Sequence, residues 1–216
     1  MDLLNHPVQL IVVLFLLSVL PLFLVMGTSF LKLSIVLSLF RNALGIQQIP
    51  PNMAIYGLAL ILTLFIMAPV GMAVQDNLKK HPVDLSSPDF YSAIDTQILA
   101  PYRQFITPQT SKKQILFFSS IGKKIWPTAY QARISENSLV VLVPAFAVSQ
   151  LIEAFKIGLL LYLPFIAIDL IVSNILLAMG MMMVSPMTIS LPFKLLIFVL
   201  VDGWGKLLGQ LVLSYS

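Results

Sequence analysis

Three charged residues stand within or between long apolar stretches in the second half of the chain, where an ionisable side chain is costly. Glu153 and Lys156 are three residues apart and would share one face of a helix, and Asp169 separates two apolar runs. A charge in such surroundings is by default a functional candidate with a partner to be found. Two interpretations of Glu153 and Lys156 stay open: a local ion pair that neutralises itself, or contacts across a subunit boundary.

Two further charged residues, Lys194 and Asp202, lie at the edges of later apolar runs. A lysine near a helix end can carry its ammonium group to a polar region along its apolar stem, which accounts for Lys194 and for Lys32. Asp202 is interpreted as a helix-end or packing residue beside Trp204. We expect intramembrane or intersubunit polar contacts from five residues: Glu153, Lys156, Asp169, Lys194 and Asp202.

The patterns that mark enzymes and cofactor sites are missing from the sequence. There is no cysteine, His6 and His81 stand alone, and neither a P-loop nor a Gly-x-Ser-x-Gly pattern is present. Asp169 and Asp202 supply the two carboxylates that an aspartyl dyad requires, but their surroundings add nothing else to that chemistry. The sequence therefore predicts a protein that is not an enzyme and that holds no metal and no cofactor.

Methionines are concentrated at one place, where five of the ten in the chain fall within residues 179–187 beside a glycine and a proline. Methionine is flexible and polarizable, so it fills irregular gaps and can reseal after displacement. One interpretation is ordinary core packing next to a break. The other is a soft apolar constriction, in which symmetry copies of the turn close a pore to water and ions by dewetting.

The composition excludes a water-soluble domain. Of 216 residues, 58% are hydrophobic and 10% are charged, with a mean hydropathy of +0.95, whereas soluble domains carry about 25% charged residues. Most of the surface must therefore face lipid or other apolar protein. The net charge of +4 is small and scattered, which excludes nucleic acid as a partner because such binding needs a dense basic face.

Thirteen of the 22 charged residues fall between Asp76 and Glu136, so a polar middle divides two apolar parts. The apolar stretches exceed the roughly 20 residues that cross a bilayer. We predict an all-α membrane-associated protein, with a first hydrophobic helical hairpin over residues 1–75, a polar, mainly helical insert over 76–136, and a second hydrophobic hairpin over 137–216. Within the insert, residues 84–89 indicate a turn and N-cap before a helix over 90–99.

Prolines interrupt almost every apolar stretch, at Pro21, Pro69, Pro144, Pro164, Pro186 and Pro192. Each removes a backbone donor and obstructs the preceding turn, so broken helices are expected. Over residues 139–163, the fifteen Leu, Ile, Val and Phe contribute roughly −4 to −9 kcal/mol to membrane insertion, whereas Glu153 and Lys156 cost about 5 to 7 kcal/mol. Because the two contributions sum to nearly zero, we expect this helix to need contacts with neighbouring protein and not to be stable in lipid alone.

Charges near the first hairpin predict its orientation. The amino terminus carries an acid and no Lys or Arg, so it lacks the positive region of a cleaved signal peptide. Lys32 and Arg41 follow the first apolar stretch, and the positive-inside tendency places that loop in the cytoplasm. The insert is then expected on the outer side of the membrane.

Long ordered motifs cover nearly the whole chain, at Thr28–Ile35, Arg41–Met53, Pro144–Gly158, Tyr162–Asp169, Gly180–Lys194 and Val201–Trp204. With these motifs the chain resembles the core export-gate proteins of bacterial type III secretion systems, the FliP and SctR family. The insert matches that family least. Ser185 stands where flagellar members usually have a proline, and together with the missing signal peptide it favours the injectisome, or virulence, branch.

The resemblance implies a homo-oligomer, a pentamer in the family pattern, wound with two small helical export-apparatus subunits into a conical helical complex. It implies contacts with the switch and export-gate membrane proteins of the same system, and unfolded secretion substrates in transit. The assembly would belong to the bacterial inner membrane and sit raised above its plane, with the insert on the periplasmic side. The methionine run, Met181, Met182 and Met183, would be the gasket that seals the export channel at rest.

Gln150 departs from the family pattern, because many members have a glutamate there, and a carboxylate role at this position is in doubt. A small-solute transporter or channel subunit stays the alternative function, since broken helices and charges near the membrane midplane are features of such proteins. A transporter would act alone or as a simple homo-oligomer, whereas a gate subunit would be inactive without its partner subunits.

Overall fold

The structure is a computed structural model, and it describes residues 7–46, 49–80, 94–131 and 134–216. Every element in these ranges is helical, which confirms the all-α fold class. In chain order the elements are α1 (Pro7–Gly27), α2 (Phe30–Leu44), α3 (Asn52–Lys80), the π-helical turn η2 (Ile94–Leu99), α5 (Ala100–Ile106), α6 (Lys112–Ile125), α7 (Thr128–Gln131), α8 (Leu139–Ala178), α9 (Pro186–Leu200) and α10 (Gly203–Leu213).

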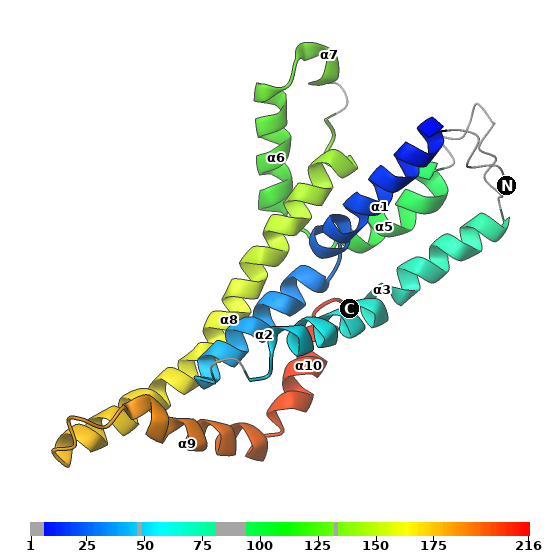
Figure 1. Cartoon of the computed structure of the whole chain (residues 1–216). Coiled ribbons are helices and arrows are strands. Elements are labelled where there is room, and N and C mark those ends of the chain that lie inside the picture. The colour runs from blue at the N-terminus through cyan, green and yellow to red at the C-terminus, as the bar shows by residue number, and fades with distance from the viewer. Residues whose placement is uncertain (1–6, 47–48, 81–93, 132–133) are drawn as a thin grey trace.

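The 40-residue helix α8 is the spine of the molecule (Figure 1). Helices α2 and α6 pack along it, and α9 returns beside its carboxyl-terminal end before α10 turns toward the middle of the structure. Helix α3 flanks α2, and its last residue, Lys80, lies beyond the boundary expected at residue 75. Residues 84–89, where a turn was expected, and the first residues of the helix expected over 90–99 lie outside the described part.

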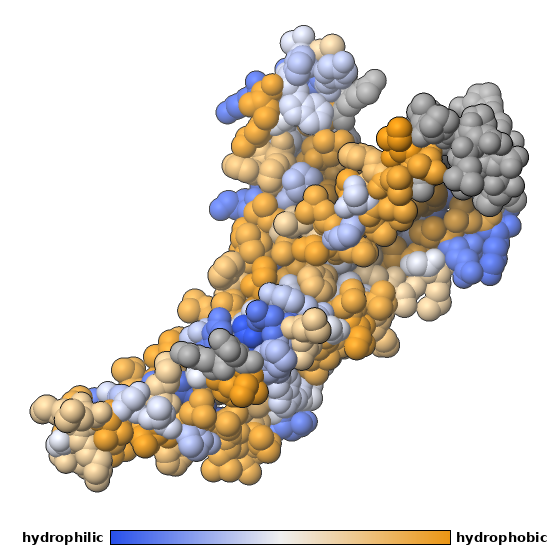
Figure 2. Space-filling model, in the orientation of Figure 1, coloured by the Kyte–Doolittle hydropathy of each residue, from blue (hydrophilic) through white to orange (hydrophobic). Residues whose placement is uncertain are grey.

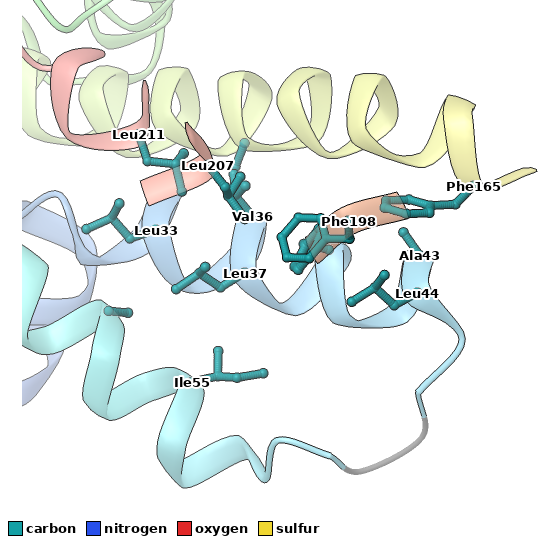
Figure 3. Packing of buried hydrophobic residues seen from close by; sticks show 13 residues of the cluster. Leu33, Val36, Leu37, Ala43, Leu44, Ile55, Phe165, Phe198, Leu207 and Leu211 are labelled. Carbon is teal, nitrogen blue, oxygen red and sulfur yellow. The ribbon is translucent and has the colours of Figure 1, made fainter. Parts of the chain in front are cut away.

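The main core is built around α2, whose buried residues recur at helical spacing and so define one apolar face. Figure 3 shows these side chains between the ribbons of α8 and α3, with Phe198 and Phe165 closing the cluster from α9 and α8. The ring of Phe40 lies 4.6 Å from that of Phe198 and 5.4 Å from that of Trp204, centroid to centroid. Aromatic packing thus joins α2 to the α9 and α10 corner.

The prolines do not break the helices that contain them. Pro21, Pro69, Pro144, Pro164 and Pro192 all lie inside continuous helices, so the breaks expected at these positions are absent. In apolar surroundings a helix keeps most backbone groups satisfied, which makes a local irregularity at proline less costly than a full break.

The sharp bends lie at two other places, 62° between α1 and α2 and 65° between α9 and α10. At the first, the Thr28 hydroxyl donates to the Leu24 carbonyl and accepts from the Phe30 N–H. At the second, Asp202 has φ +52°, a left-handed conformation that aspartate tolerates better than most residues. A Cβ at Gly203 would overlap the Phe198 ring, so this corner also requires a glycine.

Within the described ranges two helices, α3 and α8, are long and apolar enough to cross a membrane, and the two bent pairs raise that number to four if each pair counts as one span. This agrees with a membrane-associated chain of two hydrophobic hairpins. The expected insert joins the hairpins through α5, whose Tyr102 hydroxyl donates to the Gly27 carbonyl at 2.7 Å. Burial raises the pKa of the Tyr102 phenol to about 12. The insert therefore packs against the bend between α1 and α2.

Candidate pore turn and its polar supports

The methionine-rich turn joins α8 to α9 at the far tip of the molecule (Figure 1). Helix α8 ends in a Schellman motif. The Gly180 N–H donates to the Leu177 carbonyl at 3.0 Å, and the next N–H donates to the Leu176 carbonyl at 2.9 Å. Gly180 has φ +74°, which a glycine adopts without side-chain strain. This motif ends the helix and fixes where the methionine run begins.

The three methionines predicted to form a gasket all project from this tip. Met181 is 45% exposed, Met182 is 82% exposed and Met183 is fully exposed. Helix α9 then begins with Ser185 at its N-cap position and Pro186 in its first turn. The fold therefore presents a set of exposed apolar side chains, of a residue type with a flexible and polarizable side chain, between two helices.

Asp169 and Lys194 form the strongest polar contact near the turn. The Lys194 ammonium lies 2.7 Å from one carboxylate oxygen of Asp169, and the Ser190 hydroxyl donates to the other at 2.5 Å. Because Asp169 is on α8 and its two partners are on α9, these bonds fix the angle between the helices that carry the turn. Lys194 is 1% exposed, whereas the Asp169 side chain is 35% exposed.

Lys194 also donates to the Ala43 carbonyl of α2 at 3.3 Å. The ammonium group there donates to one of the last carbonyls of α2, and its positive charge interacts favourably with the negative end of the α2 dipole. A single lysine therefore ties three helices together beneath the turn.

Glu153 finds its partner on α2 and not on its own helix. Its carboxylate lies 3.9 Å from the Lys32 ammonium, and within the described residues no ion pair involves Lys156, which is exposed. The Lys32 ammonium is also 3.8 Å from the centre of the Tyr215 ring, a cation–π contact. The single chain therefore shows an interhelical pair in place of a local Glu153–Lys156 pair.

The snorkelling interpretation of Lys32 and Lys194 is wrong. The side chains are 0% and 1% exposed, so neither carries its charge to the surface of the chain. Each is held inside by an acid and a second favourable group, an aromatic ring for Lys32 and a carbonyl for Lys194. The hydrogen bonds of Lys194 offset the cost of its burial. The Lys32 ammonium has no hydrogen-bond partner in the described part of the chain, so its acid and ring offset that cost only in part. The apolar sequence around each lysine gave no sign of these contacts.

Asp202 is confirmed as a helix-end residue, because it occupies the N-cap position of α10. Asp169 bonds to Ser190 and Lys194, so its carboxylate is engaged elsewhere and the aspartyl-dyad arrangement gains no support. Among the described residues no group of three or more His, Cys, Asp or Glu could hold a metal ion. His6 and His81 lie outside them.

Sequence reasoning missed a buried network around Gln150. Its amide donates to the Gln109 carbonyl at 2.9 Å, and its oxygen accepts from the Tyr215 hydroxyl at 2.6 Å. Both halves of the amide are used, so glutamine is the residue that fits and a carboxylate would lack the donor. The only signal in the sequence was the departure from the family pattern at this position.

Most of the visible surface of the chain is apolar (Figure 2). A groove of about 1080 Å³ runs between α1 and α3, lined by residues such as Leu24 and Leu60. A second, of about 670 Å³, lies between α8 and the α9–α10 corner beside Leu161 and Leu207. A surface that is mostly apolar and carries two apolar grooves is typical of contact with lipid or other protein.

Comparison with known proteins gives consistent results. Residues 13–211 match the FliP family. The chain is 59% identical over 217 residues to the "Virulence protein YscR" of Salmonella typhimurium, covering 100% of both chains. It is 57% identical to the "Yop proteins translocation protein R" of Yersinia pestis, covering 97% of this chain and 96% of that one. It is 47% identical to the "Harpin secretion protein HrcR" of Erwinia amylovora, covering 92% of each.

Proposed function

The chain belongs to the FliP family, in the branch of the virulence-associated type III secretion systems, and from this premise we propose that it builds and seals the entry of the export channel. In general terms the chain is a membrane protein of a type III secretion system and a structural part of the apparatus. The finer proposal concerns how copies of the chain form the channel and what closes it.

The observation that carries the proposal is the exposure of Met181, Met182 and Met183 at the tip of the hairpin formed by α8 and α9. Copies related by an axis through this tip would bring several methionine runs together. Such a ring excludes water and ions by dewetting and deforms around a passing chain, because thioether side chains have low rotational barriers. The Asp169–Lys194 contact supports this role by holding the two helices that carry the turn.

The assembly we propose is a homo-oligomer, a pentamer, wound with two small helical subunits and in contact with the switch and export-gate membrane proteins. Its support is the apolar surface, which the described residues of a single chain leave uncovered (Figure 2). Unfolded secretion substrates would pass through the channel. The complex would lie in the bacterial inner membrane and rise above its plane, with the insert on the periplasmic side.

Native mass spectrometry tests the assembly. The detergent-extracted chain is measured alone and after co-expression with the small hydrophobic proteins encoded beside it. We expect a discrete oligomer that takes up those partners in fixed numbers. A monomer or dimer that ignores them would overturn the proposal and favour the alternative, a small-solute transporter, which solute-uptake assays on the purified chain would then examine.

A further inference from the structure

Helix α6 has two sides, and the described residues pack against one of them. Its inner side lies against α8, with Ser119 and Gly122 buried. We call the other side the outer face of α6. Its residues follow Lys113 at spacings of three, four, seven and eleven, so they lie on one side of the helix. They are Lys113, Leu116, Phe117, Ser120 and Lys124. Leu116 is 56% and Phe117 is 51% exposed. The outer face is therefore an apolar surface without a partner among the residues that the structure describes.

This face borders a groove of about 720 Å³, whose lining comes from α6 and from Val148 of α8. The α6 residues that line it are Lys113, Gln114, Leu116, Phe117 and Ser120. In Figure 1 the two helices form an arm that points away from the methionine turn. In Figure 2 hydrophilic groups lie at both ends of the outer edge of this arm, with hydrophobic groups between them. A ligand of this groove would need an apolar middle and polar ends.

The ends of α6 are strongly basic. Lys112 and Lys113 lie in its first turn, and Lys123 and Lys124 lie in its last. All four are exposed, and none takes part in an ion pair within the described ranges. The first pair stands at the positive end of the helix dipole, where lysine is unfavourable, so helix stability does not explain it. The two pairs are ten or eleven residues apart, about 15 Å along the helix.

We propose that the outer face of α6 docks an amphipathic helix from another protein subunit. The apolar residues of that helix would cover Leu116 and Phe117, and acidic residues near both its ends would pair with the lysines. Such complementarity gives a partner its register and orientation. The docking does not use the methionine turn, and it rests on the proposed function only in placing the chain within a multi-subunit apparatus.

Two other occupants fit the observations less well. A second copy of this chain would need two acids ten or eleven residues apart on one helix, and no described helix has them; on α8, for example, Glu153 and Asp169 are sixteen apart. A flat lipid surface would have to touch both ends of α6. That geometry conflicts with α8 as a membrane span, since α6 packs along α8.

A charge-swap experiment tests the recognition. The full chain in detergent is titrated with three labelled synthetic helices, which carry glutamates at both ends of an apolar centre, glutamates in the centre, or lysines at both ends. We expect the first to bind about tenfold tighter than the second at low salt. The variant K112E/K113E/K123E/K124E should lose this preference and bind the lysine-ended helix instead. The exposed pair at the end of α3 supplies the control, K79E/K80E, which should behave as the unmodified chain.

Equal binding of the first two helices, or no effect of charge reversal on α6, would overturn the proposal. A photocrosslinking experiment, with a photoreactive amino acid in place of Phe117, tests the same contact in the intact apparatus. Adducts with a helix that carries acids on both sides of an apolar centre support docking, whereas adducts with lipid or with a second copy of this chain contradict it. Because native mass spectrometry measures assembly separately, failure here would leave the channel proposal standing.

Discussion

Lys194 holds Asp169 at 2.7 Å, and the two residues differ sharply in burial. The ammonium lies inside the protein between α8, α9 and the end of α2, while about a third of the Asp169 side chain reaches solvent. An acid and a base in one ion pair therefore stand in unequal surroundings. A buried charge that loses its counter-charge is costlier than an exposed one.

This asymmetry predicts that Asp169→Asn destabilises the chain more than Lys194→Met. Asp169→Asn leaves a buried ammonium without its acid and should cost about 2 to 4 kcal/mol, whereas Lys194→Met leaves a part-exposed carboxylate and should cost about 1 to 2 kcal/mol. Denaturant unfolding in detergent, followed by circular dichroism, measures both. The double variant should cost less than the sum, and Lys206→Met, an exposed lysine on α10, serves as the control. Equal costs for the two single variants would contradict this reading of the pair.

Glu153→Gln should destabilise the chain by about 1 kcal/mol, because Lys32 would stay buried with only the Tyr215 ring as a favourable neighbour. Lys156→Gln is the matched control and should change the free energy of unfolding by less than about 0.5 kcal/mol. The same unfolding assay compares the two. If Lys156→Gln proved as costly as Glu153→Gln, the local pair on α8 would be the important one.

The sequence predicted the helical class and the two apolar hairpins, because composition and apolar run length carry that information. For the methionine run it left core packing and an exposed constriction open. It did not predict which charges pair. Lys32 meets Glu153 through the packing of α2 on α8, and no spacing within one helix reports a contact between helices. The helix breaks expected at the prolines were wrong for a related reason. The free-energy cost of a proline inside a helix depends on the protein or lipid around that helix, and a single sequence does not show those surroundings.

Gly158→Ala should separate α2 from α8. A Cβ at this buried glycine would overlap a methyl group of Leu39 and lie 3.2 Å from the Leu39 Cβ. The Leu39 side chain would have to move and α2 to give way by a few tenths of an ångström, at a cost of about 1 to 3 kcal/mol. Gly57→Ala, in α3, meets nothing within 4 Å and should instead stabilise the chain by up to about 1 kcal/mol. Opposite signs in the unfolding free energies are the expected result. A stabilising Gly158→Ala would contradict close packing at this point.

At the candidate site, too, local features could be predicted from the sequence and contacts between distant residues could not. A glycine after an apolar helix and a cluster of methionines indicated the turn, and Gly180 does end α8 in a Schellman motif. The network of Gln150, Gln109 and Tyr215 was missed because its members are separated by up to 106 positions in the chain. Polar residues so far apart share no local pattern.

The seal is the central claim, and ion leak through the resting apparatus tests it most directly. Flux is measured in cells or proteoliposomes that contain the assembled complex, with M181A/M182A/M183A compared against Met72→Ala, an exposed methionine on α3. We predict that the triple variant assembles, still exports substrate and leaks ions at rest, whereas Met72→Ala stays tight. An assembled triple variant that is as tight as the unmodified complex would contradict the gasket.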